Sequence, residues 1–581
     1  MSDRLHSASE PPALRERQPA AHSRPSATHP TLGTTRNRLS LVACLCLVAF
    51  VAAVAGRVLA GARLAGQDQS WYLYAAGRML HGVTLYGPQL TETNPPLILW
   101  ASMAPCAVAH WLHVRELTAL YAMFLLLVLA SVAACVRLLA DALPRRSTGA
   151  RLLFGFCLFA AVTHVPLSMF AQREHFTVVL MLPYLVAFGL PRRFPLRTAT
   201  AVTVGLCAGV AICFKPQQAL LWLAFQTAAM YSERTLFPLD RKKLRHPLHV
   251  ALLTVIGTGA AYLAAIAVLA PLYLRSTLPL LRNTYWAFGH DSAMTVERYD
   301  WRLFPLLALC LLVLLLRRRL ALSRFGGLLL AAVAGAMIAY GMQHTGFDYQ
   351  HLPQDVLTLL ALLWMLAEAA LHFAPGALSQ LRPTPREAPL LAVVALLGVA
   401  MGVHLAHAAE RAQAATPDPL AQFYATLPPG TPVFALSTNP KAGFPYVLHD
   451  HLVWAGRFAH LWMLPAVERQ QEFAHGGPRP AKLLAPAVRD ALERQQQEEV
   501  AADLDARQPS YVLVPHCYGA YSCEALSAPQ FDTLSWFATD AAFRKAWMPY
   551  RLVQTLRLDG RAEWDVYRRE LPLPAQPHET P

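Results

Sequence analysis

The sequence predicts a mainly α-helical, polytopic membrane protein with a small extracytoplasmic α/β domain at its C-terminal end. Hydrophobic residues make up 55% of the 581 residues and the mean hydropathy is +0.33, whereas soluble domains are about 45–50% apolar. Apolar runs of roughly 16–24 residues recur between positions 40 and 408, long enough to cross a bilayer. We therefore expect a transmembrane bundle of about 11 spans over residues 40–408 and an α/β domain over residues 409–581.

Residues 1–39 precede the first predicted span and are polar, with many proline, serine and arginine residues. This composition predicts a disordered tail that stays in the cytoplasm, and no cleavable signal is expected. The net charge of +14 comes mostly from arginine in short loops. It indicates membrane topology and lipid contact, and not a nucleic-acid partner.

Arginine-rich loops set the predicted topology, because such loops are retained on the cytoplasmic side. Two apolar runs lie between each successive pair of these loops. The chain therefore crosses the membrane twice and returns to the cytoplasmic side each time, as the loop charges require. A last span at about 390–408 then places residues 409–581 outside, and the first span places the loop 62–94 outside. The loops counted as cytoplasmic are 191–197, 232–249, 317–319 and 375–389.

One conflict concerns the stretch 95–140, which must cross the membrane once but holds two apolar runs, 96–113 and 117–140. Two explanations stay open. Either one run is re-entrant or lies in the interface, or the assignment of residues 141–151 to the cytoplasmic side is wrong.

The region after residue 408 contains short runs with strand character and one charged helical run at 481–506. Cys517 and Cys523 are the two cysteines in a polar region, and they could form a disulfide outside the cytoplasm. No CxxC pair or HExxH helix is present, so a structural zinc site is not expected. The predicted strands are 432–437, 510–515, 550–555 and 564–567.

The first outer loop contains an amphipathic segment that suits a helix lying at the membrane surface. Trp71, Tyr72 and Tyr74 supply its apolar face, and Asp68 stands where the helical run begins. Two interpretations of Asp68 are open: an N-cap, because aspartate is a preferred cap, or a general base or charge stabiliser at a membrane-surface site.

Charged side chains also occur at two other predicted outer turns. Arg173, Glu174 and His175 stand in a row between apolar runs, either as a solvated turn or as the lining of a polar cavity. Lys215 is the lone cation of a tight outer turn, where the positive-inside bias disfavours it. It is either a snorkelling lysine or a point charge for a phosphate.

The last predicted outer loop, 343–354, contains Gln343, His344, Asp348, Tyr349 and His351. The alternatives are an ordinary polar loop, a metal set of the two histidines and the aspartate, or a part of a binding site. The histidine spacing is not diagnostic of a metal.

These parts suit one chemical task. A lipid phosphate that arrives from the bilayer needs cations at the membrane mouth, and Arg173, Lys215 and a histidine would serve. A carboxylate opposite would take the proton of an incoming hydroxyl, a contribution of about 10²–10⁴ in rate.

The outer-loop motifs resemble those of the GT-C superfamily of membrane glycosyltransferases, in particular the polyprenyl-phosphate-sugar transferases. These motifs cover about residues 40–410. Members with lysine or histidine just before the first-loop proline differ from this chain, which has Asn94 there. The matching residues are Asp68, Tyr72, Leu73, Ala76, Gly82, Tyr86, Asn94, Pro95 and Pro96, then Gln172, Arg173, Glu174, His175, Pro183 and Tyr184, then Lys215, Pro216, Gln343, Tyr349, His351 and Pro353.

The resemblance implies an inverting sugar transfer from a polyprenyl phosphate on the outer face of a bacterial inner membrane, with the site and the C-terminal domain periplasmic. It implies Asp68 as base or acceptor-positioning acid and Glu174 as the second-loop acid. A lipid, glycan or protein would be the acceptor, and a divalent cation, Mg²⁺ or Mn²⁺, is left open. The substrate-binding residues expected are Tyr72, Glu92, Asn94, Arg173, His175, Lys215, Gln343, Tyr349 and His351.

Two other functions are weighed against this enzyme. A transporter or flippase of lipid-linked sugars predicts repeated halves with broken helices, and the sequence shows no internal repeat. A non-catalytic envelope assembly protein would use residues 409–581 as its working part, and it predicts that an Asp68→Asn variant keeps its function.

Overall fold

The structure is a computed structural model. It describes residues 51–56, 66–142, 148–164, 169–235, 246–287, 303–315, 324–373, 418–516 and 531–570, apart from positions 53, 193, 286, 478 and 559. The predicted tail 1–39, the last span at 390–408, most of the first span and the cysteine pair at 517 and 523 lie outside these residues.

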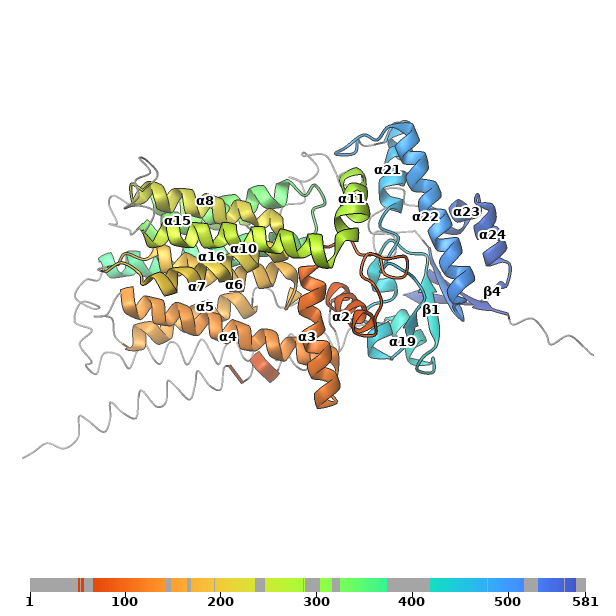
Figure 1. Ribbon diagram of the computed structural model, residues 1–581, viewed down its shortest axis with the longest axis horizontal. Coiled ribbons are helices and arrows are strands. Elements are labelled where there is room, and N and C mark those ends of the chain that lie inside the picture. The colour runs from red at the N-terminus through yellow and green to blue at the C-terminus, as the bar shows by residue number, and fades with distance from the viewer. Residues whose placement is uncertain are drawn as a thin grey trace, which may run out of the picture.

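A bundle of side-by-side helices forms one half of the molecule, at the left of Figure 1. Helix α13 (Leu303–Leu315) packs against α16 in this bundle. Three of the described helices, α4, α10 and α15, are long and apolar enough to cross a membrane, and the count of about 11 spans stays a prediction. The other helices of the bundle are α4 (Glu116–Ala142), α5 (Thr148–His164), α6 (Arg173–Gly189), α7 (Thr198–Phe214), α8 (Ala219–Ser232), α10 (Pro247–Leu269), α15 (Arg324–Gly341) and α16 (Leu352–Phe373).

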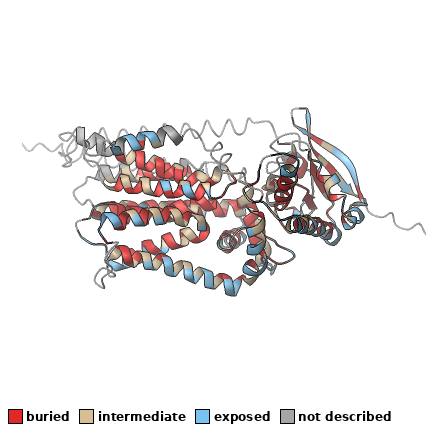
Figure 2. Cartoon of the chain, turned by 90° about the horizontal axis from the view of Figure 1, so that it is seen from above, coloured by how far each residue is buried: buried red, intermediate tan, exposed pale blue. Residues whose placement is uncertain are grey.

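Helix α10 shows why this bundle suits a lipid environment. It packs closely against α7, where a Cβ at Gly209 would lie 2.6 Å from the Cβ of Thr258. Its other face is apolar and exposed, as at Leu263 and Val268, which are 62% and 77% exposed. Figure 2 shows exposed positions along the outer faces and buried ones inside. Long apolar surfaces of this kind are rare in water and usual in hydrocarbon.

The conflict over residues 95–140 has a structural answer in α3 (Leu97–Leu112). In Figure 1 this helix runs across the end of the bundle, crosswise to α4. Its C-terminal end exposes Trp111 (77%) and Leu112 (51%), which suits the membrane interface. The arrangement supports the interfacial explanation, with α4 as the one crossing of this stretch.

The second half of the molecule is an α/β unit built on a five-stranded sheet of order β2-β1-β3-β5-β4. Strand β1 pairs in parallel with β2 and β3, whereas β5 pairs antiparallel with β3 and β4. The four predicted strands are confirmed, and the two-residue β2 was missed because it is too short to show alternation. The strands are β1 (Pro432–Ala435), β2 (Val453–Trp454), β3 (Tyr511–Pro515), β4 (Tyr550–Leu558) and β5 (Arg561–Arg569).

Helices cover this sheet and short elements join the two halves. The predicted helix at 481–506 is α22, which starts later, at Pro486. The helices of the unit are α19 (Pro419–Ala425), α20 (Tyr446–His449), α21 (Leu464–Ala474), α22 (Pro486–Arg507), α23 (Thr533–Phe537) and α24 (Ala541–Trp547), with the 3₁₀ turn η6 (Pro440–Ala442). Helix α2 (Gln67–Leu80) contacts α20 and η6 of this unit. The other short elements are η3 (Pro216–Gln218), the π-turn η4 (Tyr273–Thr277), α11 (Leu278–Thr284) and η5 (Asp348–His351).

The first outer loop is held between the bundle and the α/β unit. The ring of Phe444 lies 5.3 Å from that of Trp71 and 5.6 Å from that of Tyr74. The Tyr74 hydroxyl accepts a hydrogen bond from the Trp454 amide at 2.8 Å. Because these aromatic side chains join one apolar core with the sheet, α2 has a fixed position at the outer end of the bundle.

Candidate active site

Asp68 lies in the first turn of α2 and is half-buried. The N-cap of this helix is Gly66 and no side chain caps it, so the N-cap interpretation of Asp68 is wrong. Burial raises the pKa of the Asp68 carboxyl. The Arg173 guanidinium and a hydrogen bond with Gln172 oppose this shift, and the Glu174 carboxylate adds to it. A carboxyl group with a raised pKa is a better proton acceptor near neutral pH.

Two glutamines connect the start of α2 to the turn that precedes α6. The Gln69 amide donates to the Phe170 carbonyl at 2.9 Å, and the Gln172 amide donates to the Gln69 side-chain oxygen at 3.3 Å. Both glutamines are buried. Asp68 and the row that begins at Arg173 are therefore held against each other although they are about a hundred residues apart.

Arg173 is buried and faces the first loop. Its guanidinium donates to the Asn94 side-chain oxygen and lies 5.8 Å from the centre of the Tyr72 ring. The Asn94 amide in turn donates to the Tyr72 hydroxyl at 3.2 Å. The Nε of Arg173 has no hydrogen-bond partner among the described residues. This buried donor is free for an anion.

Glu92 has a different role from the substrate contact expected of it. Its carboxylate accepts hydrogen bonds from Trp71, from Thr93 at 2.7 Å and from the backbone and side-chain nitrogens of Asn94 at 2.8 and 2.7 Å. The loop therefore saturates the oxygens of this buried acid. Glu92 orients Asn94, and through it Arg173.

A buried ion pair joins Lys215 to Glu174, the residue that follows Arg173 in α6. The Lys215 Nζ lies 2.7 Å from the Glu174 Oε1, and the two side chains are 4% and 0% exposed. The Nζ also lies 5.6 Å from the centre of the Tyr349 ring. Burial lowers the pKa of Lys215 to about 8, with Glu174 opposing the shift and Arg173 adding to it. Lys215 thus contacts an acid and an aromatic ring, and not the lipid surface expected of a snorkelling lysine.

The two histidines expected to bind substrate have different surroundings. The His175 ring accepts from the Ala171 amide at 3.3 Å and lies 4.6 Å from the Phe124 ring and 5.2 Å from the Phe170 ring. It is fully buried in an aromatic core, so we correct its assignment to a structural one. His351 lies 2.5 Å from the carboxylate of Asp355, one helical turn further on.

The loop after α15 contributes Tyr349 and the buried Gln343 to the same end of the bundle. Burial and the Asp68 charge raise the pKa of Tyr349, so its hydroxyl stays protonated. No group of three metal-ligating side chains occurs among the residues that the structure describes, and the side chain of Asp348 lies outside them. The conceivable metal set of His344, Asp348 and His351 therefore stays a prediction, because one of its three side chains lies outside the described part.

Sequence reasoning missed Tyr285. Tyr285 follows α11 and hydrogen-bonds with Thr345 and Gln350, while the charges of Arg173 and Glu174 act on its hydroxyl. Its pKa is raised, with burial as the main cause. Tyr285 carries no charge and belongs to no recognisable motif, so no pattern in the sequence points to it. Its place in the cluster comes from chain segments that meet only in the fold.

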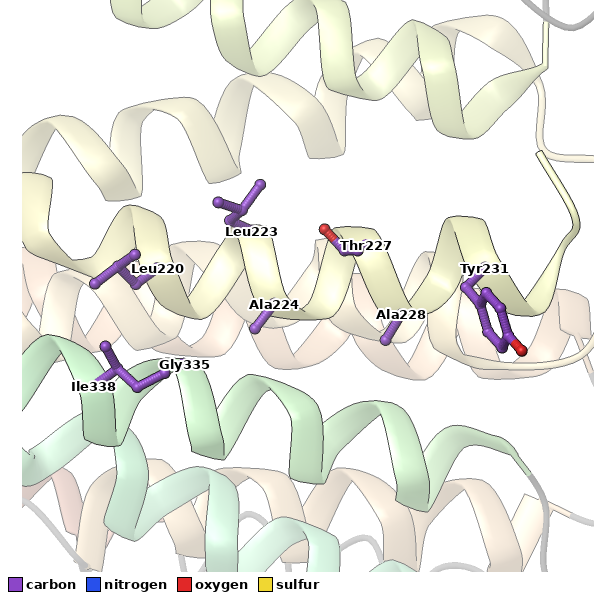
Figure 3. Close-up of a pocket in the computed structure, with 8 residues that line it drawn as sticks. All are labelled: Leu220, Leu223, Ala224, Thr227, Ala228, Tyr231, Gly335 and Ile338. Carbon is purple, nitrogen blue, oxygen red and sulfur yellow. The ribbon is translucent and has the colours of Figure 1, made fainter. Parts of the chain in front are cut away.

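A separate hollow of about 540 Å³ runs along α8 and α15. Figure 3 shows its lining, which is apolar except for the hydroxyl groups of Thr227 and Tyr231. No charged side chain lines it, so it is suited to hydrocarbon and not to the chemistry of a phosphate.

No protein-family model matches the chain, and no curated protein sequence matches it. Among solved structures, ArnT from Cupriavidus metallidurans in the apo state is similar with a TM-score of 0.52 and 14% identity, covering 92% of this chain and 98% of ArnT. The same protein bound to undecaprenyl phosphate gives a TM-score of 0.50 and 12% identity over 91% and 98% of the two chains. The chain has the GT-C fold. The arabinofuranosyltransferase AftD from Mycobacteria gives a TM-score of 0.44 and 14% identity, covering 92% of this chain and 40% of AftD.

Within this GT-C fold the polar residues of separate loops meet at one end of the bundle. Asp68 comes from α2, Arg173 and Glu174 from the start of α6, and Lys215 from the turn after α7. The charges of Arg173, Glu174 and Lys215 act on one another and on Asp68. The convergence predicted for these four residues is therefore present in the structure, with two acids and two cations side by side.

Proposed function

We propose that this protein is an integral-membrane, inverting glycosyltransferase that moves a sugar from a polyprenyl phosphate to an acceptor hydroxyl on the outer face of the bacterial inner membrane. The observation that carries the proposal is the meeting of Asp68, Arg173, Glu174 and Lys215 at one end of an apolar bundle. ArnT, which shares the fold, has been solved with undecaprenyl phosphate bound. That lipid phosphate fits the two cations of the cluster.

In the proposed reaction the acceptor oxygen attacks the anomeric carbon of the sugar while Asp68 takes the hydroxyl proton. The bond between that carbon and the phosphate oxygen breaks, and its electron pair leaves with the polyprenyl phosphate. Arg173 and Lys215 stabilise the charge that develops on this phosphate, which is the larger electrostatic contribution. Glu174 keeps Lys215 charged, because its carboxylate raises the pKa of the buried ammonium.

The α/β unit supports this role from the acceptor side. Its contacts fix the first loop, as in the hydrogen bond of 2.7 Å from the Thr91 amide to the Arg457 carbonyl. Arg457 is itself paired with Asp503 at 3.1 Å. We propose that the unit holds α2 next to the turn at Arg173 and presents the acceptor to Asp68.

The test is a transfer assay with the purified full-length protein in lipid nanodiscs, polyprenyl-phosphate sugars and candidate acceptors. Wild type should release polyprenyl phosphate in an acceptor-dependent manner, and Asp68→Asn should not. Glu233→Gln is the matched control acid, because Glu233 follows the far end of α8, pairs with Arg324 and takes no part in the proposed reaction. Equal turnover of wild type and Asp68→Asn would overturn the proposal. Lipid movement without glycosidic bond formation would favour the flippase.

A further inference from the structure

Helix α22 of the α/β unit carries a buried acid, Asp503, that takes no part in the proposed reaction. Its side chain is 4% exposed, and the Arg457 Nη2 lies 3.1 Å from its carboxylate. The carboxylate also accepts hydrogen bonds from the Arg457 backbone amide at 2.9 Å and from the Arg457 Nε at 3.1 Å. One acid therefore fixes both the main chain and the side chain of Arg457, through hydrogen bonds of the stronger, charged kind.

The segment that contains Arg457 is also held by close packing against the sheet. A Cβ at Gly456 would lie 2.5 Å from the Phe434 ring, and the Trp454 indole donates to the Phe458 carbonyl at 2.9 Å. The three aromatic side chains are buried. The carbonyl of Arg457 therefore has a fixed position relative to β1 and β2.

The first outer loop binds to this fixed point. The Thr91 amide donates to the Arg457 carbonyl at 2.7 Å. Two residues earlier, the Gln89 carbonyl accepts a hydrogen bond from Arg507 of α22 at 2.9 Å. Arg507 lies one helical turn after Asp503 and forms an ion pair with it at 3.8 Å. Residues of α22 therefore hold the loop at two points, directly at Gln89 and through Arg457 at Thr91.

The same loop sets the direction of Arg173. Glu92 follows Thr91 and accepts hydrogen bonds from the backbone and side-chain nitrogens of Asn94 at 2.8 and 2.7 Å. The Asn94 side-chain oxygen in turn accepts a hydrogen bond from the Arg173 guanidinium. A series of hydrogen bonds between neighbouring residues therefore joins Asp503 to a cation of the proposed phosphate site.

This connection affects binding because an arginine side chain loses rotamer freedom when it binds a phosphate. A guanidinium that is already held in its binding direction loses less, so the phosphate binds more tightly. We infer that Asp503 is a positioning residue for the donor phosphate, because it holds the loop that orients Arg173 before the donor arrives. The inference rests on the proposed function for the identity of the donor. It adds that donor affinity depends on α22, although none of the four charged residues of the site comes from this helix.

The experiment measures the affinity of the purified full-length protein in nanodiscs for bare polyprenyl phosphate. Asp503→Asn should weaken this binding about fivefold, because the amide keeps the shape of the side chain and loses the charge that holds Arg457. Asn94→Ala removes the direct contact with Arg173 and should weaken binding by at least the same factor. The double variant should bind like Asn94→Ala alone, since the loop can then no longer act on Arg173.

Two further variants separate this role from general stability. Asp565→Asn is the matched control, because Asp565 is a carboxylate of the same unit that accepts from Thr555 at 2.6 Å and lies 3.0 Å from His516. Its Tm should fall while its affinity for polyprenyl phosphate stays at the wild-type value. Arg507→Met removes the hydrogen bond to the Gln89 carbonyl and should weaken binding in the same direction as Asp503→Asn. It decides the question, alone and combined with Asn94→Ala, if Asp503→Asn does not fold.

Several results would overturn the inference. These are wild-type affinity in folded Asp503→Asn and Arg507→Met, or losses that multiply in the double variant with Asn94→Ala. An equal loss of affinity in Asp565→Asn would also overturn it, because any weakening of the unit would then act on the donor. Coupling between Asp503 and Asn94 without sugar transfer by the wild type would refute only the proposed reaction. Transfer without this coupling would refute only the positioning role.

Discussion

The lowered pKa of Lys215 predicts that donor affinity depends on pH in a range where the donor itself does not titrate. Lys215 is buried, its pKa is about 8, and its Nζ lies 2.7 Å from Glu174. A polyprenyl-phosphate sugar is a phosphodiester with no ionisation near neutral pH. Since the charged lysine is the form that binds phosphate, affinity should be full below pH 8 and be lost as the pH rises through this value.

The magnitude follows from the protonated fraction of Lys215. With a pKa of about 8, roughly 90% of the lysine is charged at pH 7 and roughly 10% at pH 9. Donor affinity should therefore fall about tenfold over these two units, which is about 1.4 kcal/mol. The assay is equilibrium binding of a polyprenyl-phosphate hexose to the full-length protein in nanodiscs between pH 6.5 and 9.5.

Two variants separate Lys215 from other titrating groups. Lys215→Arg keeps its charge over the whole range and should remove the midpoint near pH 8. Glu174→Gln should move the midpoint to lower pH, because the carboxylate raises the pKa of its partner. Wild-type affinity that is flat from pH 7 to 9, or a midpoint that persists in Lys215→Arg, would refute the reasoning.

Three further predictions concern residues with distinct roles. Asp68→Asn should lower kcat by about 10²–10⁴ with little change in donor affinity, since it removes a base and no phosphate contact; a loss confined to KM would contradict this. His175→Phe should lower the free energy of unfolding by about 1–3 kcal/mol, because the Ala171 amide loses its hydrogen-bond acceptor. Its kcat should stay at the wild-type value, and lost turnover in a folded variant would restore the role of His175 in substrate binding. Tyr74→Phe removes the hydroxyl that accepts a hydrogen bond from the Trp454 amide, so it should lower Tm and reduce kcat more than donor affinity. A Tm and a kcat that both equal the wild-type values would disprove this.

The sequence could predict those features whose cause is local. Short runs rich in β-branched and aromatic residues marked β3 and β5, and the amphipathic pattern around Trp71 marked α2. Charge at apolar boundaries marked Arg173, Glu174 and Lys215, because ionised groups are excluded from hydrocarbon and gather where helices end. The crosswise direction of α3 could not be read, since an interfacial helix and a spanning helix share the same composition.

What the sequence could not predict depends on contacts between distant segments. His175 looks like a phosphate ligand beside Arg173 and Glu174, but successive helical residues point in different directions, and its ring meets Phe124. Glu92 looks like a free acid until its loop folds around it.

The most direct measurement is an electron cryomicroscopy structure of the full-length protein with a polyprenyl-phosphate sugar bound. We predict a lipid phosphate within hydrogen-bond distance of both the Arg173 guanidinium and the Lys215 ammonium, with the Asp68 carboxylate on the side of the anomeric carbon away from the phosphate. A phosphate bound elsewhere, or one that leaves the two cations in contact only with Asn94 and Glu174, would contradict the account.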